Sequence, residues 1–171
     1  LFRSLREDGI AVIAAGAEMG IDTFAVDFRP GLRDLARAAI QMGHRSFVFV
    51  GDCPWDLKPG ERYEELKNHF SESGVLDHAP TVIPCDQNTE AARVAFSRYW
   101  RERSSGERPT LAVAINDQLA LGVLRACRDL RLTVPGDLSV VGFDNTPQGA
   151  ASYLALTSIG ATLSTVADRC S

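Results

Sequence analysis

Three short apolar runs place the strongest constraint on how this chain can fold. They read SFVFV at Ser46–Val50, LAVAI at Leu111–Ile115 and LSVVGF at Leu138–Phe143. A strand with one face in water alternates apolar and polar residues, whereas a strand covered on both faces does not. Strands covered on both faces are typical of parallel sheets with helices on either side. The three runs therefore predict the centre of a parallel sheet.

Stretches with apolar residues at helical spacing lie between these runs and predict the helices. Four such stretches occur, at residues 32–40, 63–70, 92–100 and 119–130. Gly43 follows the first stretch, where a glycine that ends a helix is expected. Further short runs predict strands at residues 10–15, 24–27, 81–84 and 157–159. The alternation of strand and helix over residues 24–143 indicates an α/β fold with a doubly wound parallel sheet.

The charge of the chain limits its partners. With 22 acidic residues against 18 lysines and arginines, its formal net charge is −4. A surface of that sign binds polyanions poorly, so we expect any contact with DNA to lie outside this segment. No apolar run approaches the ~20 residues that a membrane span needs, and no membrane partner is expected. The chain lacks an initiator methionine and opens within an amphipathic pattern, which suggests a piece of a longer protein.

The sequence carries no pattern for catalysis, a metal or a cofactor. The four cysteines are widely spaced and form no CxxC pair. We therefore expect no zinc site and no disulfide framework, but thiols in a reducing compartment, the cytoplasm. The motifs GxGxxG, GxxxxGK[ST], HExxH and GxSxG do not occur. These observations predict that the protein is not an enzyme and uses neither a metal nor a cofactor.

Polar side chains follow the predicted strands at their carboxyl ends. The candidates are Trp55, Arg62, Gln87, Asn116, Asp117 and Asp144. Ligands of doubly wound sheets bind at this edge. Carboxylates, amides and a guanidinium together suit vicinal hydroxyl groups, each of which both donates and accepts hydrogen bonds. The sequence therefore predicts a site for a small polar ligand.

Each candidate also has a purely structural alternative. Asn116 or Asp117 can cap the helix that follows, and for Asp117 we favour capping. Arg62 can pair with a nearby glutamate at the surface, where an ion pair contributes little. Trp55 can cover the end of the sheet. Asp144 has the weakest alternative, because it directly follows five largely apolar residues.

The segment AINDQLALGVLRACRDLRLTVPGDLSVVGFDN at Ala114–Asn145 resembles the signature of the lactose/galactose-repressor (LacI/GalR) family of transcription regulators. The residues that match the signature are Asn116, Asp117, Ala120, Gly122, Val134, Pro135, Asp137, Ser139, Gly142, Phe143 and Asp144. Weaker agreement covers MGHR at Met42–Arg45, Arg62 and LTSI at Leu156–Ile159. The resemblance therefore extends over nearly the whole chain.

The resemblance implies a two-lobed fold like that of periplasmic sugar-binding proteins. On that template residues 1–27 belong to the N-terminal lobe, residues 28–144 form the C-terminal effector-binding lobe, and residues 145–171 return to the N-terminal lobe. On the same template, the DNA-binding head is expected to lie outside this chain. Arg62, Asn116 and Asp144 fall on effector contacts of the family. Gln87 stands where many members carry a stacking aromatic residue, a surface that Trp55 can supply.

The function that the resemblance implies is effector sensing by a cytoplasmic transcription regulator. A small polar ligand, a sugar or sugar derivative, would bind between the lobes, and a head outside this chain would bind DNA. The family dimerises partly through the helix at residues 117–131, and Leu121 and Leu124 are our candidates for a homodimer interface. Packing in the core is the alternative for both leucines. An exported solute-binding protein of the same fold is the alternative function.

Overall fold

The computed structural model describes residues 13–15, 22–24, 27–51, 61–150 and 156–160. Most of them build a five-stranded sheet in the order β4-β3-β5-β6-β7, in which every neighbouring pair is parallel. The strands are β3 (Phe47–Val50), β4 (Thr81–Ile83), β5 (Leu111–Ala114), β6 (Ser139–Phe143) and β7 (Thr157–Ile159). The predicted α/β fold with a parallel sheet is confirmed.

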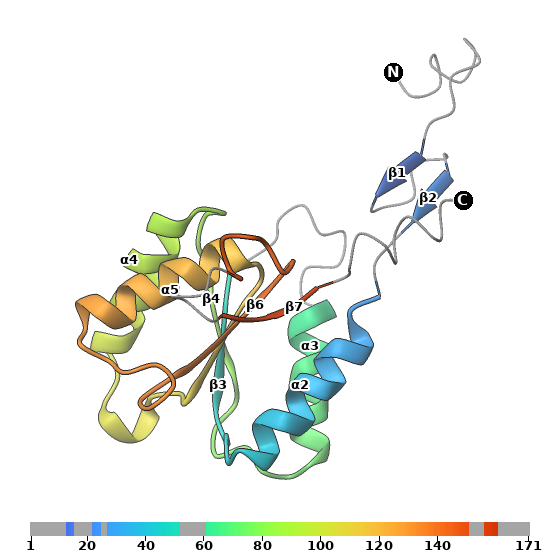
Figure 1. The fold of residues 1–171 in the computed structure, drawn as a ribbon. Coiled ribbons are helices and arrows are strands. Elements are labelled where there is room, and N and C mark those ends of the chain that lie inside the picture. The colour runs from blue at the N-terminus through green and yellow to red at the C-terminus, as the bar shows by residue number, and fades with distance from the viewer. Residues whose placement is uncertain (1–12, 16–21, 25–26, 52–60, 151–155, 161–171) are drawn as a thin grey trace.

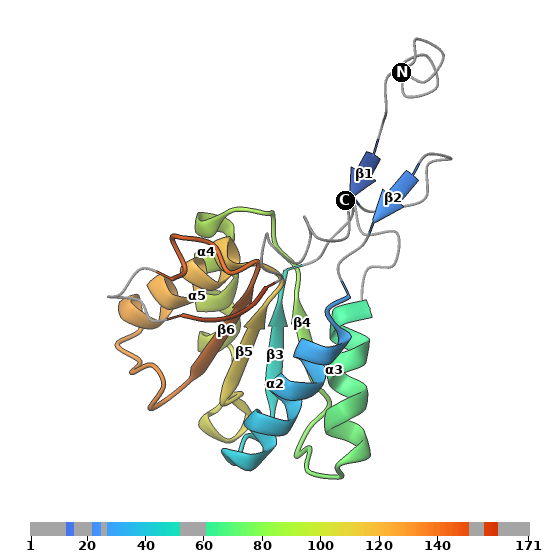
Figure 2. The same cartoon turned by 45° about the vertical axis from the view of Figure 1, so that its right-hand side comes forward.

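Helices cover both faces of this sheet. They are α2 (Arg29–Gln41), α3 (Glu61–Glu72), α4 (Thr89–Arg101) and α5 (Asp117–Asp129), with a short 3-10 helix η1 (Ser105–Glu107) after α4. In Figures 1 and 2, α2 and α3 lie together on one side of the strands and α4 and α5 on the other. All residues of β3 and β5 are buried between these two layers. Their burial explains why both strands lack polar alternation.

The strand order reverses beside β3, and this reversal locates a crevice at one edge of the sheet. From β3 the chain passes through α3 to β4, and then through α4 to β5 on the other side of β3. Doubly wound sheets bind ligands at the carboxyl ends of the strands at such a reversal. Val113 of β5 pairs with Val141 of β6, so Asn116 and Asp144 follow their strands at equivalent positions.

Two short strands near the N-terminus form a separate parallel pair. They are β1 (Ile13–Ala15) and β2 (Asp22–Phe24), with Ile13 opposite Asp22. Both figures show this pair away from the five-stranded sheet. The sequence predicted strands at residues 10–15 and 24–27, of which residues 10–12 and 25–26 lie outside the described part. The second strand therefore begins earlier than the apolar pattern indicated.

β7 joins the five-stranded sheet, where it is hydrogen bonded to β6. The return of residues 145–171 into an N-terminal lobe stays a prediction. The amide of Asp144 also donates to the carbonyl of Ile159 at 2.9 Å. A three-residue strand carries too little pattern to reveal its neighbours, so only the pairing itself places it.

Helices α2 and α5 end in the same hydrogen-bond motif with different residues at its key position. After α2, Gly43 has a φ of 90°, and the amide of His44 donates to the carbonyl of Ala39 at 3.0 Å. After α5, Arg131 has a φ of 58°, and the amide of Leu132 donates to Cys127 at 2.8 Å. This left-handed backbone favours glycine, which confirms the predicted role of Gly43 and leaves Arg131 strained.

We expect Arg131→Gly to raise the free energy of unfolding by about 1 kcal/mol. Relief of the left-handed strain, roughly 1–2 kcal/mol, exceeds the added freedom of glycine in the unfolded chain, about 0.4–1 kcal/mol. Gly43→Ala is the matched control and should lower stability by about as much, because alanine is strained at a φ of 90°. No atom would touch the added methyl group, so this variant reports the backbone strain alone. Urea unfolding midpoints measure both, and an unchanged or lower midpoint for Arg131→Gly would contradict the strain.

Candidate functional site

Asn116 is the residue that caps α5. Its backbone is extended at the N-cap position, and its Oδ1 accepts a hydrogen bond from the amide of Leu119 at 2.8 Å. Its Nδ2 donates to Oε1 of Gln87 at 2.8 Å. The structure therefore brings together two of the predicted site residues, from the ends of β5 and β4. The capping alternative that the sequence left open applies to Asn116, in addition to any contact with a ligand.

Arg62, in the first turn of α3, is held in place by three neighbours. Its Nη1 donates to the carbonyl of Ile115 at 2.8 Å. The centre of its guanidinium lies 4.1 Å from the ring centroid of Phe28 and 4.7 Å from that of Phe143. The two rings meet edge to face with centroids 5.6 Å apart. Cation–π contacts and a fixed hydrogen bond orient the remaining guanidinium donors in advance of binding.

In the part of the chain that the structure describes, Arg62 forms no ion pair with a glutamate and has a backbone carbonyl and two aromatic rings as its partners. This arrangement also introduces Phe28, which the sequence analysis did not single out. Phe28 immediately precedes α2 and is half-buried against the core. Its only signal in the sequence is a large apolar residue at the start of a helix, which is too common to indicate a role beside an arginine.

Asp144 follows β6 in a strained conformation. Its φ is 91° and that of Asn145 is 48°, a region that residues other than glycine adopt at a cost of about 1–3 kcal/mol. Partial burial raises the pKa of its carboxyl group, the charge of Arg62 acts in the opposite direction, and the charge of Asp117 raises the pKa further. Strain of this kind is concentrated where a side chain is held for function.

Asp117 does not cap α5, contrary to the role that the sequence analysis favoured. It is the first residue of the helix and is fully buried. Its Oδ2 accepts hydrogen bonds from the amide of Thr146 at 2.6 Å and from Oγ1 of Thr146 at 2.9 Å. Its Oδ1 accepts one from Oγ of Ser158 at 2.6 Å. The carboxylate therefore links the turn after β6 to β7, through contacts distant in sequence that no local pattern predicts.

The other predicted residues have less definite positions. Trp55 lies outside the described residues. Leu121 and Leu124 are both partly exposed on α5, and Leu124 also packs against the core. Leu121 is therefore the better of the two candidates for an interface.

The edge formed by Arg62 and Asp144 can recognise a neutral polar ligand. The guanidinium supplies only donors and the carboxylate supplies acceptors, so together they suit adjacent hydroxyl groups. Arg62 is half-buried and Asp144 is exposed, so the low local dielectric strengthens mainly the contacts of the guanidinium. Among the described residues there is no group of three acidic, histidine or cysteine side chains that could hold a metal ion.

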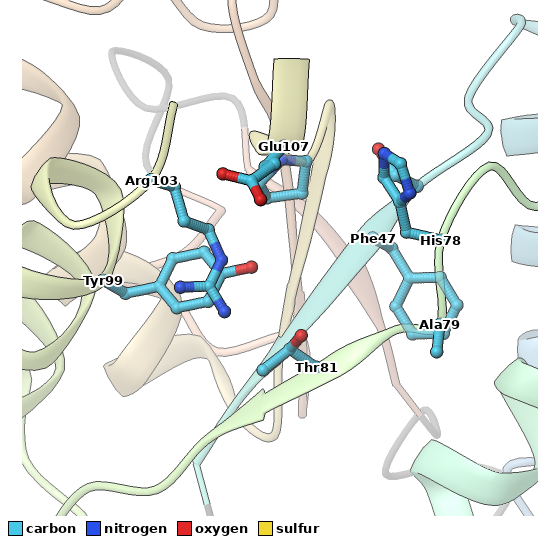
Figure 3. Close-up of a pocket in the computed structure, with 9 residues that line it drawn as sticks. Phe47, His78, Ala79, Thr81, Tyr99, Arg103 and Glu107 are labelled. Atoms are coloured by element: carbon cyan, nitrogen blue, oxygen red, sulfur yellow. The ribbon is translucent and has the colours of Figure 1, made fainter. Parts of the chain in front are cut away.

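A cavity of about 280 Å³ lies at the opposite edge of the sheet, where β3, β4 and β5 begin. Figure 3 shows the guanidinium of Arg103 against the ring of Tyr99, with Glu107 and His78 on other walls. The distance from this guanidinium to the ring centroid is 3.9 Å. Oε2 of Glu107 already accepts a hydrogen bond from Oγ of Ser104 at 2.7 Å. We place the site at the carboxyl edge instead, because ligands of this sheet topology bind there.

Comparison with known proteins shows the relationships of the chain. Residues 36–170 match the family described as periplasmic binding protein-like domain. Catabolite control protein A of Priestia megaterium is 28% identical over 151 residues, 86% of this chain and 45% of that protein. The arabinose metabolism transcriptional repressor of Halalkalibacterium halodurans is 32% identical over 124 residues, 70% of this chain and 32% of that protein.

A solved structure has the same fold. The LacI family transcriptional regulator from Arthrobacter sp. FB24, in complex with lactose, superposes with a TM-score of 0.77 and 21% identity, over 92% of this chain and 57% of that one. The chain thus spans less than half the length of the two curated relatives. In the described part of the chain, no helix has the length and apolar character to cross a membrane.

Proposed function

The chain belongs to the periplasmic binding protein-like domain family, as part of a LacI/GalR-type regulator, and on that premise we propose that it senses a small polar effector at the edge formed by Arg62 and Asp144. The observation that carries the proposal is the fixed Arg62 guanidinium, packed on two aromatic rings beside the strained Asp144. A sugar or sugar derivative is the effector that such donors and acceptors suit.

We propose that the five-stranded sheet is the C-terminal lobe and that β1 and β2 belong to the N-terminal lobe. The pairing of β7 with β6 supports moving the boundary from residue 144 to a point after residue 160. An effector that contacts both lobes would bind one arrangement of them more tightly and so increase its population. That change would reach DNA through a head outside this chain, in a cytoplasmic homodimer that uses Leu121 and Leu124.

A thermal-shift screen of sugars, polyols and nucleosides tests this function, and the full-length protein is the one to screen because both lobes contribute to such a site. An effector present at 100 times its dissociation constant should add about 2.7 kcal/mol to the free energy of unfolding. For a domain of this size that corresponds to about 5–10 °C in melting temperature. If no compound of these classes shifted the melting temperature, the proposed ligand class would be wrong.

The alternative of an exported solute-binding protein predicts the same ligand response. It differs in the region that precedes this chain, where it requires an apolar signal peptide in place of a DNA-binding head. The curated relatives described above carry the names of regulators, and this favours the regulator. The sequence of the gene upstream of Leu1 separates the two functions.

A further inference from the structure

We infer that Asp117 is a positioning residue, whose buried carboxylate holds the turn after β6 and thereby sets where Asp144 lies. The inference rests on the proposed function only in giving Asp144 a ligand to bind. The position of the turn itself can be measured without any effector.

The turn is tied to Asp117 by hydrogen bonds from two segments. Thr146 donates to Oδ2 from both its amide, at 2.6 Å, and its hydroxyl, at 2.9 Å. Ser158 donates its hydroxyl to Oδ1 of Asp117 at 2.6 Å, and the Oγ of Ser158 in turn accepts a hydrogen bond from the amide of Asn145 at 2.9 Å. One carboxylate thus joins the turn after β6 to β7. Asp144 directly precedes Asn145 and Thr146, the two turn residues that these hydrogen bonds hold.

The backbone conformation of the turn needs such support. Asp144 and Asn145 are consecutive residues other than glycine with left-handed φ values of 91° and 48°. Strained conformations persist only where surrounding contacts determine them. The contacts on this turn include those to Ser158 and Asp117, together with the hydrogen bond from the amide of Asp144 to the carbonyl of Ile159.

The packing around Asp117 is built to accept a carboxylate. A methyl group on Gly142 or on Gly149 would collide with the Asp117 side chain. The carboxylate also lies at the N-terminus of α5, where backbone amides without an acceptor inside the helix and the helix dipole stabilise negative charge. A buried charge without hydrogen bonds is strongly disfavoured, so Asp117 and its neutral donors depend on one another.

Asp117 also acts on Asp144 through its charge. Its carboxylate raises the pKa of Asp144, after the larger effect of burial and against that of Arg62. Two readouts of Asp117 therefore exist in the free protein, namely the protection of the turn amides from hydrogen exchange and the titration of Asp144.

The chain offers a matched control for a substitution at Asp117. Oδ2 of Asp137 accepts hydrogen bonds from the amide of Thr133 at 2.7 Å and from its Oγ1 at 2.6 Å. This is the same set of donors that Thr146 presents to Asp117, but Asp137 is exposed. Asp137→Asn therefore reports the effect of weakening two such hydrogen bonds to a carboxylate at a place away from the turn.

The test is hydrogen exchange and carboxyl titration by NMR on the full-length protein. In Asp117→Asn we expect the amides of Asn145 and Thr146 to lose about tenfold or more of their protection, and the pKa of Asp144 to fall because a nearby negative charge is removed. Core amides such as that of Val113 should keep their protection relative to one another. Asp137→Asn should leave both readouts unchanged.

Two gentler variants keep the inference open to refutation if Asp117→Asn fails to fold. Ser158→Ala and Thr146→Val each remove one donor to Asp117 and keep its charge. If Asp117 organises the turn, Ser158→Ala should reduce protection of the Thr146 amide, and Thr146→Val should reduce that of the Asn145 amide. If these amides and the pKa of Asp144 behave as they do in Asp137→Asn, Asp117 does not position the turn.

Discussion

Arg62→Ala and Asp144→Asn are each expected to weaken effector binding by about 100-fold or more. Each removes hydrogen bonds from a charged group, worth roughly 1.5–3 kcal/mol apiece, and tenfold in affinity corresponds to about 1.4 kcal/mol. Asparagine is the right replacement at residue 144 because it tolerates the φ of 91° better than alanine does. Both variants should therefore lose the effector-induced shift in melting temperature without losing their fold.

Arg103→Ala is the control for this prediction. Arg103 also stacks on an aromatic ring, but it lines the cavity at the opposite edge of the sheet. Its replacement should leave the dissociation constant of the effector unchanged, as measured by calorimetry on the full-length protein. Loss of binding in Arg103→Ala, with binding retained in Arg62→Ala, would place the ligand in that cavity and overturn the site.

Phe143→Ala is expected to lower the free energy of unfolding by about 3–5 kcal/mol. The side chain of Phe143 is fully buried at the end of β6 and meets the ring of Phe28 at 5.6 Å. Removing it leaves a cavity that a parallel sheet between two helix layers cannot close by relaxing. It also takes away one of the two rings that orient Arg62, so an effect on binding should accompany the loss of stability.

Phe143→Leu separates these two effects. Leucine fills most of the space and should cost clearly less stability than alanine, yet it offers no ring face to the guanidinium. Urea unfolding midpoints give the stability of both variants. A loss below about 1 kcal/mol in Phe143→Ala would mean that this residue does not belong to the core that the buried strands define.

The strands at the centre of the sheet were predictable because their environment is uniform. Ser46–Val50 and Leu111–Ile115 are covered on both faces, so burial alone accounts for their sequence. The end of α2 at Gly43 was predictable for a similar reason, since a left-handed residue after a helix is a local requirement. That Asn116 and Asp144 follow their strands at one edge was predictable because parallel strands bring their carboxyl ends together, while the role of Arg62, Asn116 and Asp144 in ligand binding stays a prediction.

The role of Asp117 and the place of β7 were not predictable in this way. In the sequence Asp117 looks like any acidic residue at the start of a helix. Its partners Thr146 and Ser158 lie 29 and 41 residues away and are themselves unremarkable in type. Phe28 was missed because its contact with Arg62 joins the starts of two helices. In each case the information lies in a contact between segments that have no pattern in common.

The sequence alone thus determined that the chain forms a parallel sheet with a polar edge. It did so through the apolar runs and the polar residues that follow them along the chain. Periodicity and burial are properties of single segments, and a single segment carries them in its own residues. Only the tertiary structure decided that Asn116 caps α5, that Asp117 holds the turn at Asp144, and that β7 joins β6. Those outcomes depend on which segments meet in three dimensions, where hydrogen-bond partners become fixed only once the sheet has assembled.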